Sequence, residues 1–254
     1  MNCKTCDASL RSDFSYCPSC GAKVVKNRLT LKNVWEDICF QVFDLDNTLL
    51  KTFRHLFSKP DEVINSYISG ARKKYMNPIS YFAIAITLSG IMFFILKDIL
   101  DVNLTESSFS NENTPNMDFV FDYQGLLSYL IMPVYALMSW LLFLDKKILN
   151  YTEHIVTLAY TTGQASFVQV LVAIPLFSLV DFKYDVFNWL YLVFSTGYLF
   201  YVFKKIHKIS LGSIVLRGLG YLFLTLVVII GIGILMVLLG LIIGVINFED
   251  FRPK

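Results

Sequence analysis

The sequence predicts an all-α membrane protein, because five long uncharged runs follow residue 75 and four cysteines form two C-x-x-C pairs before residue 21. Hydrophobic residues make up 55% of the 254 residues, and the mean hydropathy is +0.56. This apolar content exceeds that of ordinary soluble domains and is typical of integral membrane proteins. The expected architecture is five transmembrane helices, preceded by amphipathic interfacial helices and a small metal-binding ribbon.

The N-terminal cysteines have the spacing C-x2-C-x10-C-x2-C. Each C-x-x-C pair can fold as a tight knuckle, and two knuckles complete the tetrahedral four-thiolate shell of structural zinc. Asp7 and Gly21 follow the two knuckles, where a left-handed backbone conformation is expected. A segment this short cannot bury a self-sufficient hydrophobic core, and zinc binding would therefore have to drive its folding. We predict a zinc ribbon over residues 1–23, with the ligands Cys3, Cys6, Cys17 and Cys20.

Two other uses of the cysteines stay open at this point, a redox dithiol and an iron–sulfur site. Catalytic zinc is disfavoured because four thiolates leave no open position for water. Cysteines in C-x-x-C pairs suit a reducing cytosol better than disulfides do. The first residues contain no apolar segment, so no cleavable signal peptide is expected.

Residues 24–74 are predicted to form amphipathic cytosolic or interfacial helices. Apolar residues recur at helical spacing between residues 31 and 42, which predicts the first helix. A second helix, near residues 49–59, places aromatic and aliphatic residues opposite a basic face. A third begins at Pro60 and ends near Gly70. The second helix suits two positions equally, on an anionic membrane surface or packed on the cytosolic ends of the spans.

A bilayer crossing needs roughly 20 helical residues, which the uncharged runs supply. They define a transmembrane domain over residues 75–248, followed by an external tail over residues 249–254. The expected spans are residues 77–97, 124–144, 155–180, 186–203 and 218–246.

Lysine and arginine predict the orientation of these spans. Clusters of the two residues precede the first span, separate the second from the third, and separate the fourth from the fifth. The loop 98–122 contains acidic residues and no Lys or Arg. We therefore expect a multi-pass protein of the bacterial cytoplasmic (inner) membrane, with its N-terminus in the cytosol and its C-terminus outside.

Polar residues inside spans are the default functional candidates of a membrane domain. The third predicted span has a polar face at helical spacing, which either lines a water-filled groove or contacts lipid headgroups, or else forms hydrogen bonds between helices. The candidate polar membrane site consists of Arg72, Glu153, His154, Thr157, Thr161 and Gln164.

The fifth span carries three glycines on one face, Gly233, Gly240 and Gly244, which predict close helix packing within the bundle or between copies. The sequence shows no nucleophile paired with a base and no glycine loop that would cradle phosphate, so no catalytic residue is predicted. The net charge of +2 predicts no nucleic-acid partner.

Three segments resemble an uncharacterised family of bacterial membrane proteins that begin with a zinc ribbon: the ribbon, residues 43–82 and residues 150–156. The family pattern combines Thr-x-x-x-Leu, a Pro-containing turn, Tyr-Ile-x-Gly-x-Arg, and a Glu-His pair that opens a later span. These positions correspond to Thr52, Leu56, Pro60, Tyr67, Ile68, Gly70, Arg72, Glu153 and His154. Ala71 stands where the family commonly has Lys. The resemblance implies no established activity, and the layout is also similar to the five-span Yip family.

We expect a non-enzymatic membrane scaffold or assembly protein whose cytosolic ribbon and amphipathic helices dock a partner. Its expected partners are the lipid bilayer and a protein bound by the ribbon, and the glycine face also allows a homo-oligomer. One alternative is a small-solute or lipid conduit, which a hydrated cavity reaching Thr161 and Gln164 would favour. The other is a lipid-modifying enzyme, which needs Arg72, Glu153 and His154 to converge.

Overall fold

A computed structural model of the chain contains two compact units, Met1–Asp46 and Asn47–Lys254. The regular elements of the described residues are all helical, and an isolated antiparallel bridge joins Asn2 to Ser9. The all-helical class is therefore confirmed for the described part of the chain. The structure describes residues 2–3, 6–11, 13–21, 48–104, 123–180 and 182–243, with the backbone alone from residue 232 onward. The predicted helix at 31–42, Gly244 and the tail 249–254 lie outside these residues.

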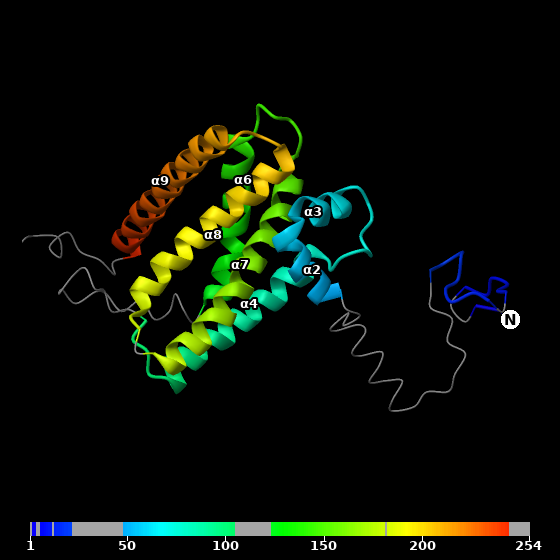
Figure 1. Cartoon of the computed structure of the whole chain (residues 1–254), viewed down its shortest axis with the longest axis horizontal. Helices are drawn as coiled ribbons and strands as arrows, with labels where there is room; N and C mark the ends of the chain where they lie inside the picture. The colour runs from blue at the N-terminus through cyan, green and yellow to red at the C-terminus, as the bar shows by residue number, and fades with distance from the viewer. Residues whose placement is uncertain are drawn as a thin grey trace, which may run out of the picture. The chain divides into compact units, whose positions relative to one another are not determined.

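Five long helices form the body of the second unit (Figure 1). By length and composition, all five can cross a membrane, which confirms the five predicted apolar spans. They are α4 (Pro78–Phe94), continued by the π-helix η2 (Ile95–Ile99), α6 (Gln124–Leu142), α7 (Tyr151–Leu179), α8 (Tyr184–His207) and α9 (Leu211–Ile243).

Three of these helices begin earlier than the uncharged runs predict. The helices α7, α8 and α9 begin at Tyr151, Tyr184 and Leu211, whereas the predicted spans begin at residues 155, 186 and 218. The side chain of Asn150 accepts a hydrogen bond from the Glu153 N–H, and the Glu153 carboxylate accepts one from the Asn150 N–H, which forms a capping box at the start of α7. A charged residue ends an uncharged run without ending a helix, so hydropathy places these starts too late.

Two short helices, α2 (Thr48–Ser58) and α3 (Pro60–Ile68), pack on the long helices α7 and α8. Pro60 begins α3, as the sequence predicts, and Gly70 adopts a positive φ of 98° just beyond its end. Leu56 of α2 and Ile64 of α3 are completely buried. The helix α2 therefore packs on the spans, which is one of the two compatible positions that the sequence predicts for it.

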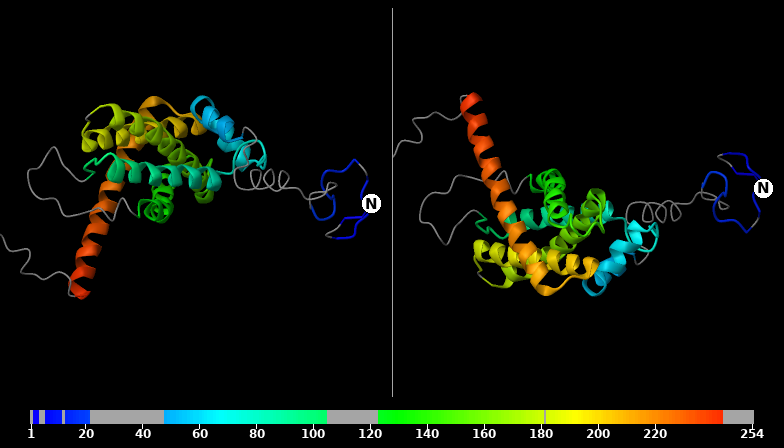
Figure 2. Two further views of the ribbon diagram at one scale, coloured as in Figure 1. Left: turned by 90° about the horizontal axis from the view of Figure 1, so that it is seen from below. Right: turned by 90° about the horizontal axis from the view of Figure 1, so that it is seen from above.

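The helix α7 occupies the centre of the bundle and contacts α2, α3, α4, α6 and α8. The two views of Figure 2 place α9 along one side, crossing the other helices at a steep angle, where it packs on α6 and α8. The helices α4 and α7 come close together at Gly163 of α7. A Cβ atom there would lie 3.1 Å from the Tyr81 ring and 3.3 Å from the Cα atom of Phe82.

The Arg217 side chain joins the first turns of α9 to the end of α6 through hydrogen bonds. Its guanidinium donates two hydrogen bonds to the Asp145 carboxylate, at 2.8 and 2.7 Å, and a third to the Leu142 carbonyl. Leu142 is the last residue of α6, so this bond satisfies a carbonyl that the helix itself leaves unpaired. The same guanidinium holds the pKa of Asp145 below its usual range.

Candidate functional site

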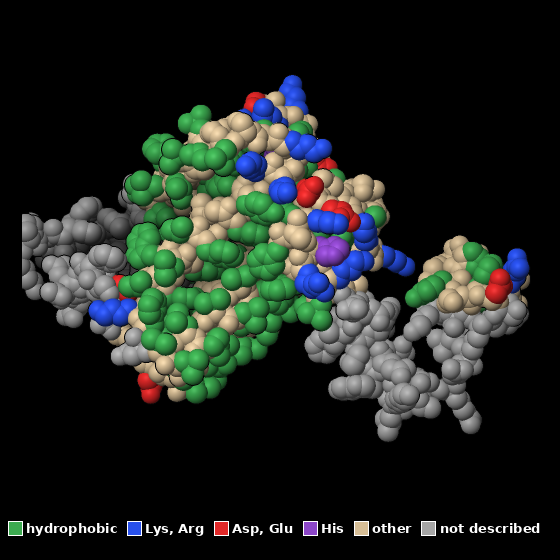
Figure 3. Space-filling view, in the orientation of Figure 1, with side chains coloured by type: hydrophobic (Ala, Val, Ile, Leu, Met, Phe, Trp, Pro, Cys, Tyr) green, Lys and Arg blue, Asp and Glu red, His purple; other side chains and the backbone are tan. Residues whose placement is uncertain are grey.

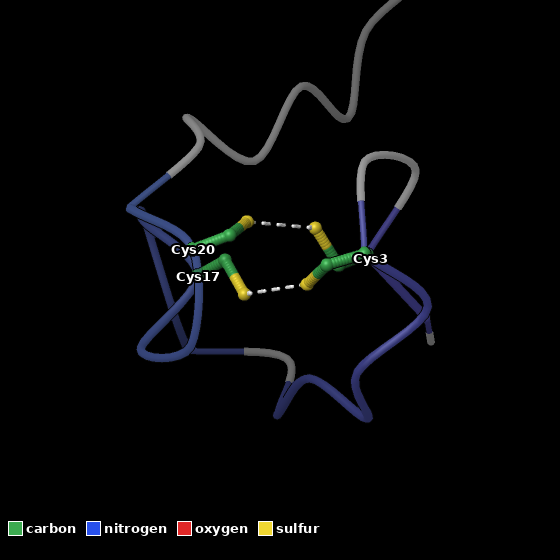
Figure 4. A group of neighbouring side chains, drawn as sticks. Cys3, Cys17 and Cys20 are labelled. Atoms are coloured by element: carbon green, nitrogen blue, oxygen red, sulfur yellow. Dashed lines mark hydrogen bonds between the residues drawn. The ribbon is translucent and has the colours of Figure 1, made fainter.

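Two knuckles in the N-terminal unit bring four cysteine side chains together. The Asp7 N–H donates to the Cys3 carbonyl and the Gly21 N–H to the Cys17 carbonyl, each at 2.9 Å, so the two turns are alike. Asp7 and Gly21 have φ values of 55° and 74°, which confirms the left-handed conformations that the sequence predicts. Figure 4 shows the sulfurs of Cys3, Cys17 and Cys20 turned toward one another across the gap between the knuckles.

The geometry of the four sulfurs fits a single metal ion. All four lie within 4.8 Å of one another, and the Cys3–Cys20 and Cys6–Cys17 pairs are separated by 3.6 and 3.7 Å. A tetrahedral ion with metal–sulfur bonds of about 2.3 Å would place its sulfurs roughly 3.8 Å apart. A disulfide needs about 2.05 Å, so neither close pair is bonded. Backbone N–H groups, foremost that of Cys20, lower the pKa of the Cys17 thiol.

The polar face predicted on the third span makes hydrogen bonds inside the bundle. Gln164 is completely buried, accepts a hydrogen bond from the Tyr81 hydroxyl of α4, and donates one of 3.2 Å to the Phe53 carbonyl of α2. The hydroxyls of Thr157 and Thr161 donate to carbonyls of their own helix. The contacts of Gln164 join α7 to α4 and α2, whereas Thr157 and Thr161 bond within α7, and Thr161 also lines a cavity.

Tyrosine hydroxyls, which the sequence did not single out, hold α2 against the spans. Tyr198 and Tyr201 of α8 donate to the carbonyls of Leu56 and Phe57, at 3.0 and 3.2 Å. Both carbonyls belong to the last turn of α2, where no helical partner is available. A buried tyrosine hydroxyl usually needs a hydrogen-bond acceptor. A tyrosine within an apolar span therefore indicates such a contact, but the sequence does not identify the acceptor.

The three residues proposed for an enzymatic site contact different partners. The Arg72 guanidinium lies over the Tyr67 ring at 5.5 Å, and the Glu153 carboxylate caps its own helix. His154 is buried and its Nδ1 atom lies 2.9 Å from the Ser139 hydroxyl. Its ring packs near His207, whose two ring nitrogens have no hydrogen-bond partner among the described residues.

Of the predicted packing glycines, Gly233 and Gly240 lie on the part of α9 for which only the backbone is described. One glycine at a described close contact between helices is Gly163 of α7, which the sequence did not single out.

Lys and Arg gather at one end of the bundle, where α4, α7 and α9 begin and α6 and α8 end (Figure 3). The helix α2, the link between α2 and α3, and the turn after α3 together contribute half of them. The opposite end has Lys97 and Lys183 beside Asp98, Asp101 and Asp185. The described cations at the first end are Lys51, Arg54, Lys59, Arg72, Lys73, Lys74, Lys146, Lys147, Lys204, Lys205, Lys208 and Arg217.

A small polar network stabilises the turn between α3 and α4. The Lys74 ammonium and the Tyr75 hydroxyl both donate to the Glu62 carboxylate, at 2.8 and 3.1 Å. The bond from Lys74, with a smaller contribution from Tyr75, holds the pKa of Glu62 below its usual range. Burial and the nearby Glu62 carboxylate raise the pKa of Tyr75 to about 12, so the hydroxyl stays a hydrogen-bond donor at neutral pH.

These features define the class of the protein as a multi-pass, all-helical membrane protein with an N-terminal cysteine cluster. The model of a family described as a protein of unknown function (DUF3667) matches residues 46–90. This segment covers α2, α3 and most of α4, and it excludes the cysteine cluster and the four later long helices. No curated protein and no solved structure matches the chain.

Replacing Gln164 with Leu is expected to destabilise the bundle by roughly 1–3 kcal/mol, because Tyr81 and the Phe53 carbonyl each lose a buried partner. Thermal unfolding of the detergent-solubilised protein measures the effect. Gln169→Leu is the matched control, since Gln169 is also buried on α7 but has no hydrogen bond within the described residues. Equal melting temperatures for the two variants would contradict the assigned contacts.

Proposed function

We propose that this protein is a non-enzymatic membrane scaffold whose zinc-bound N-terminal unit docks a cytosolic protein partner. The observation that carries the proposal is the cluster of four sulfurs within 4.8 Å of one another. Four thiolates complete the coordination shell of zinc and leave no position for a substrate, so such a site gives a small segment its fold and thereby a surface for a partner.

The membrane unit supports the anchoring role. The polar groups of Gln164, Thr157 and His154 make contacts inside the bundle, and α2 and α3 are fixed to the spans through buried side chains. The cations gathered at one end favour a cytosolic position for that end, and hence for the N-terminus, by the positive-inside rule. A bacterial cytoplasmic membrane suits this arrangement.

The conduit and enzyme alternatives receive less support. A cavity does reach Thr161, but Gln164 does not line it and is instead bonded to α2 and α4. The enzyme required Arg72, Glu153 and His154 to converge, and each of these side chains has its own separate contact.

The docking role is tested by purifying the full-length protein from native membranes and identifying the co-purifying proteins by mass spectrometry. We expect a partner that is present with the wild type and absent with Cys17→Ser. Cys39→Ser is the matched control, because Cys39 is the fifth cysteine of the chain and lies apart from the two C-x-x-C pairs. The same set of proteins from the wild type and from Cys17→Ser would contradict the docking role.

A further inference from the structure

A cavity of about 180 Å³ lies between α7, α8 and α9, with Tyr135 of α6 at one side. A second cavity of about 100 Å³ shares three of its lining residues, Tyr135, Leu158 and Thr162. Thr196, which lines the cavity, lies twelve residues beyond the start of α8 at Tyr184 and eleven residues before its end at His207. Each end of this helix is therefore roughly 17 Å away along its axis, about half of a bilayer core of about 30 Å, so the cavity lies near the membrane midplane.

Hydroxyl-bearing residues predominate among the residues that line this cavity. Eight of its thirteen lining residues are Ser, Thr or Tyr, and none is charged. The hydroxyls of Thr161, Ser195 and Thr225 donate to carbonyls of their own helices. These three groups are thereby satisfied without a ligand.

Other hydroxyls at the cavity lack a partner within the described residues. No hydrogen bond there involves the hydroxyl of Tyr135, Thr162 or Tyr221. Only 7% of Tyr221 is exposed, and its ring centroid lies 6.2 Å from that of Tyr135. A hydroxyl without an acceptor in a hydrocarbon environment is costly, so these groups require an occupant of the cavity that accepts hydrogen bonds.

The position of the cavity's opening indicates whether the occupant enters from water or from the bilayer. Leu192 of α8 and Leu222 of α9 line the cavity and are each 46% exposed on the outer surface of the bundle. The cavity therefore opens sideways, toward the bilayer. A ligand that enters there is soluble in lipid and uncharged at the depth of the cavity.

We propose that this cavity binds the head group of a membrane quinone. A quinone ring carries two carbonyl acceptors for the hydroxyls of Tyr135, Thr162 and Tyr221, and its flat face suits the tyrosine rings. Its isoprenoid tail can lie in the bilayer beyond Leu192 and Leu222. A phospholipid headgroup is charged and lies at the membrane surface, and a plain acyl chain has no acceptor within the hydrocarbon.

The test is calorimetric titration of the full-length protein in lipid nanodiscs with ubiquinone-1, a ubiquinone that carries a single isoprenoid unit. We expect saturable binding to the wild type, weakened about tenfold or more in the double variant Tyr135→Phe/Tyr221→Phe, because two hydrogen bonds are removed without loss of either ring. Tyr129→Phe is the matched control, since Tyr129 lies on α6 but does not line the cavity. Its affinity is expected to equal that of the wild type.

A second variant, Thr162→Leu, fills the shared wall of both cavities and is expected to abolish the binding. Size-exclusion profiles and melting temperatures verify that each variant is folded. An absence of saturable heat with the wild type would overturn the proposal and leave ordered water as the occupant. Unchanged affinity in the double variant would equally overturn it, because the probe would then bind elsewhere.

Discussion

The variant Cys17→Ser is expected to lose its metal and to unfold the N-terminal unit, while the helical bundle keeps its stability. The described apolar core of that unit consists of Cys3, Leu10 and Cys17, with Ala8 and Phe14 packed on it. Two of these three core residues are cysteines of the candidate metal site, so the core and that site cannot be separated. Structural zinc contributes about 10–16 kcal/mol in small zinc peptides, which exceeds what so few apolar side chains supply.

Elemental analysis of the purified protein measures this loss directly. The wild type is expected to contain one zinc ion per chain, and Cys17→Ser close to none. Limited proteolysis provides a second measurement, since cleavage should be faster in the first twenty residues of the variant and unchanged in the bundle. Cys39→Ser should keep its zinc. A wild type that contains iron, or no metal at all, would show that the zinc assignment is wrong.

Local features of the fold were predictable from the sequence because their causes are local. Gly21 and Asp7 have the backbone conformations that a C-x-x-C knuckle requires, and Pro60 starts α3. The five spans follow from hydropathy, since an uncharged run of sufficient length has few other structures available in a membrane. Only the ends were misplaced, where charged residues such as Arg217 belong to a helix but interrupt an apolar run.

The contacts of the candidate polar site were not predictable in the same way. Helical spacing placed Gln164 on a polar face, but its partners Phe53 and Tyr81 lie 111 and 83 residues earlier in the chain. Whether such a face lines a groove or joins helices depends on which helices surround it, and periodicity contains no information about neighbours. The cavity near Thr161 could not be predicted for the same reason, because four helices together form it.

Which glycine is required for close packing of two helices also depends on which helices are neighbours. A GxxxG pattern marks a face that permits close approach, whereas the need for a glycine arises only where another helix comes near. At Gly163 the backbone of α4 itself is the neighbour, because the Phe82 Cα atom lies 3.3 Å from the position of a Cβ atom. Backbone cannot rotate away as a side chain can.

Replacing Gly163 with Leu is therefore expected to destabilise the bundle by about 3 kcal/mol or more, since α4 and α7 must separate to admit four carbon atoms. Gly163→Ala should cost about 1 kcal/mol, because its single methyl group requires shifts of only a few tenths of an ångström by the Tyr81 ring and the α4 backbone. Thermal unfolding in one detergent at fixed protein concentration ranks the two variants.

Gly197→Leu on α8 is the matched control, because no atom lies within 4 Å of a Cβ atom built at that position. Leucine is a better helix former than glycine, so this variant should unfold at or above the temperature of the wild type. If Gly163→Leu unfolds at the same temperature as Gly197→Leu, then α4 and α7 do not meet at Gly163. The contact of Tyr81 with Gln164, the residue that follows Gly163, would then also be wrong.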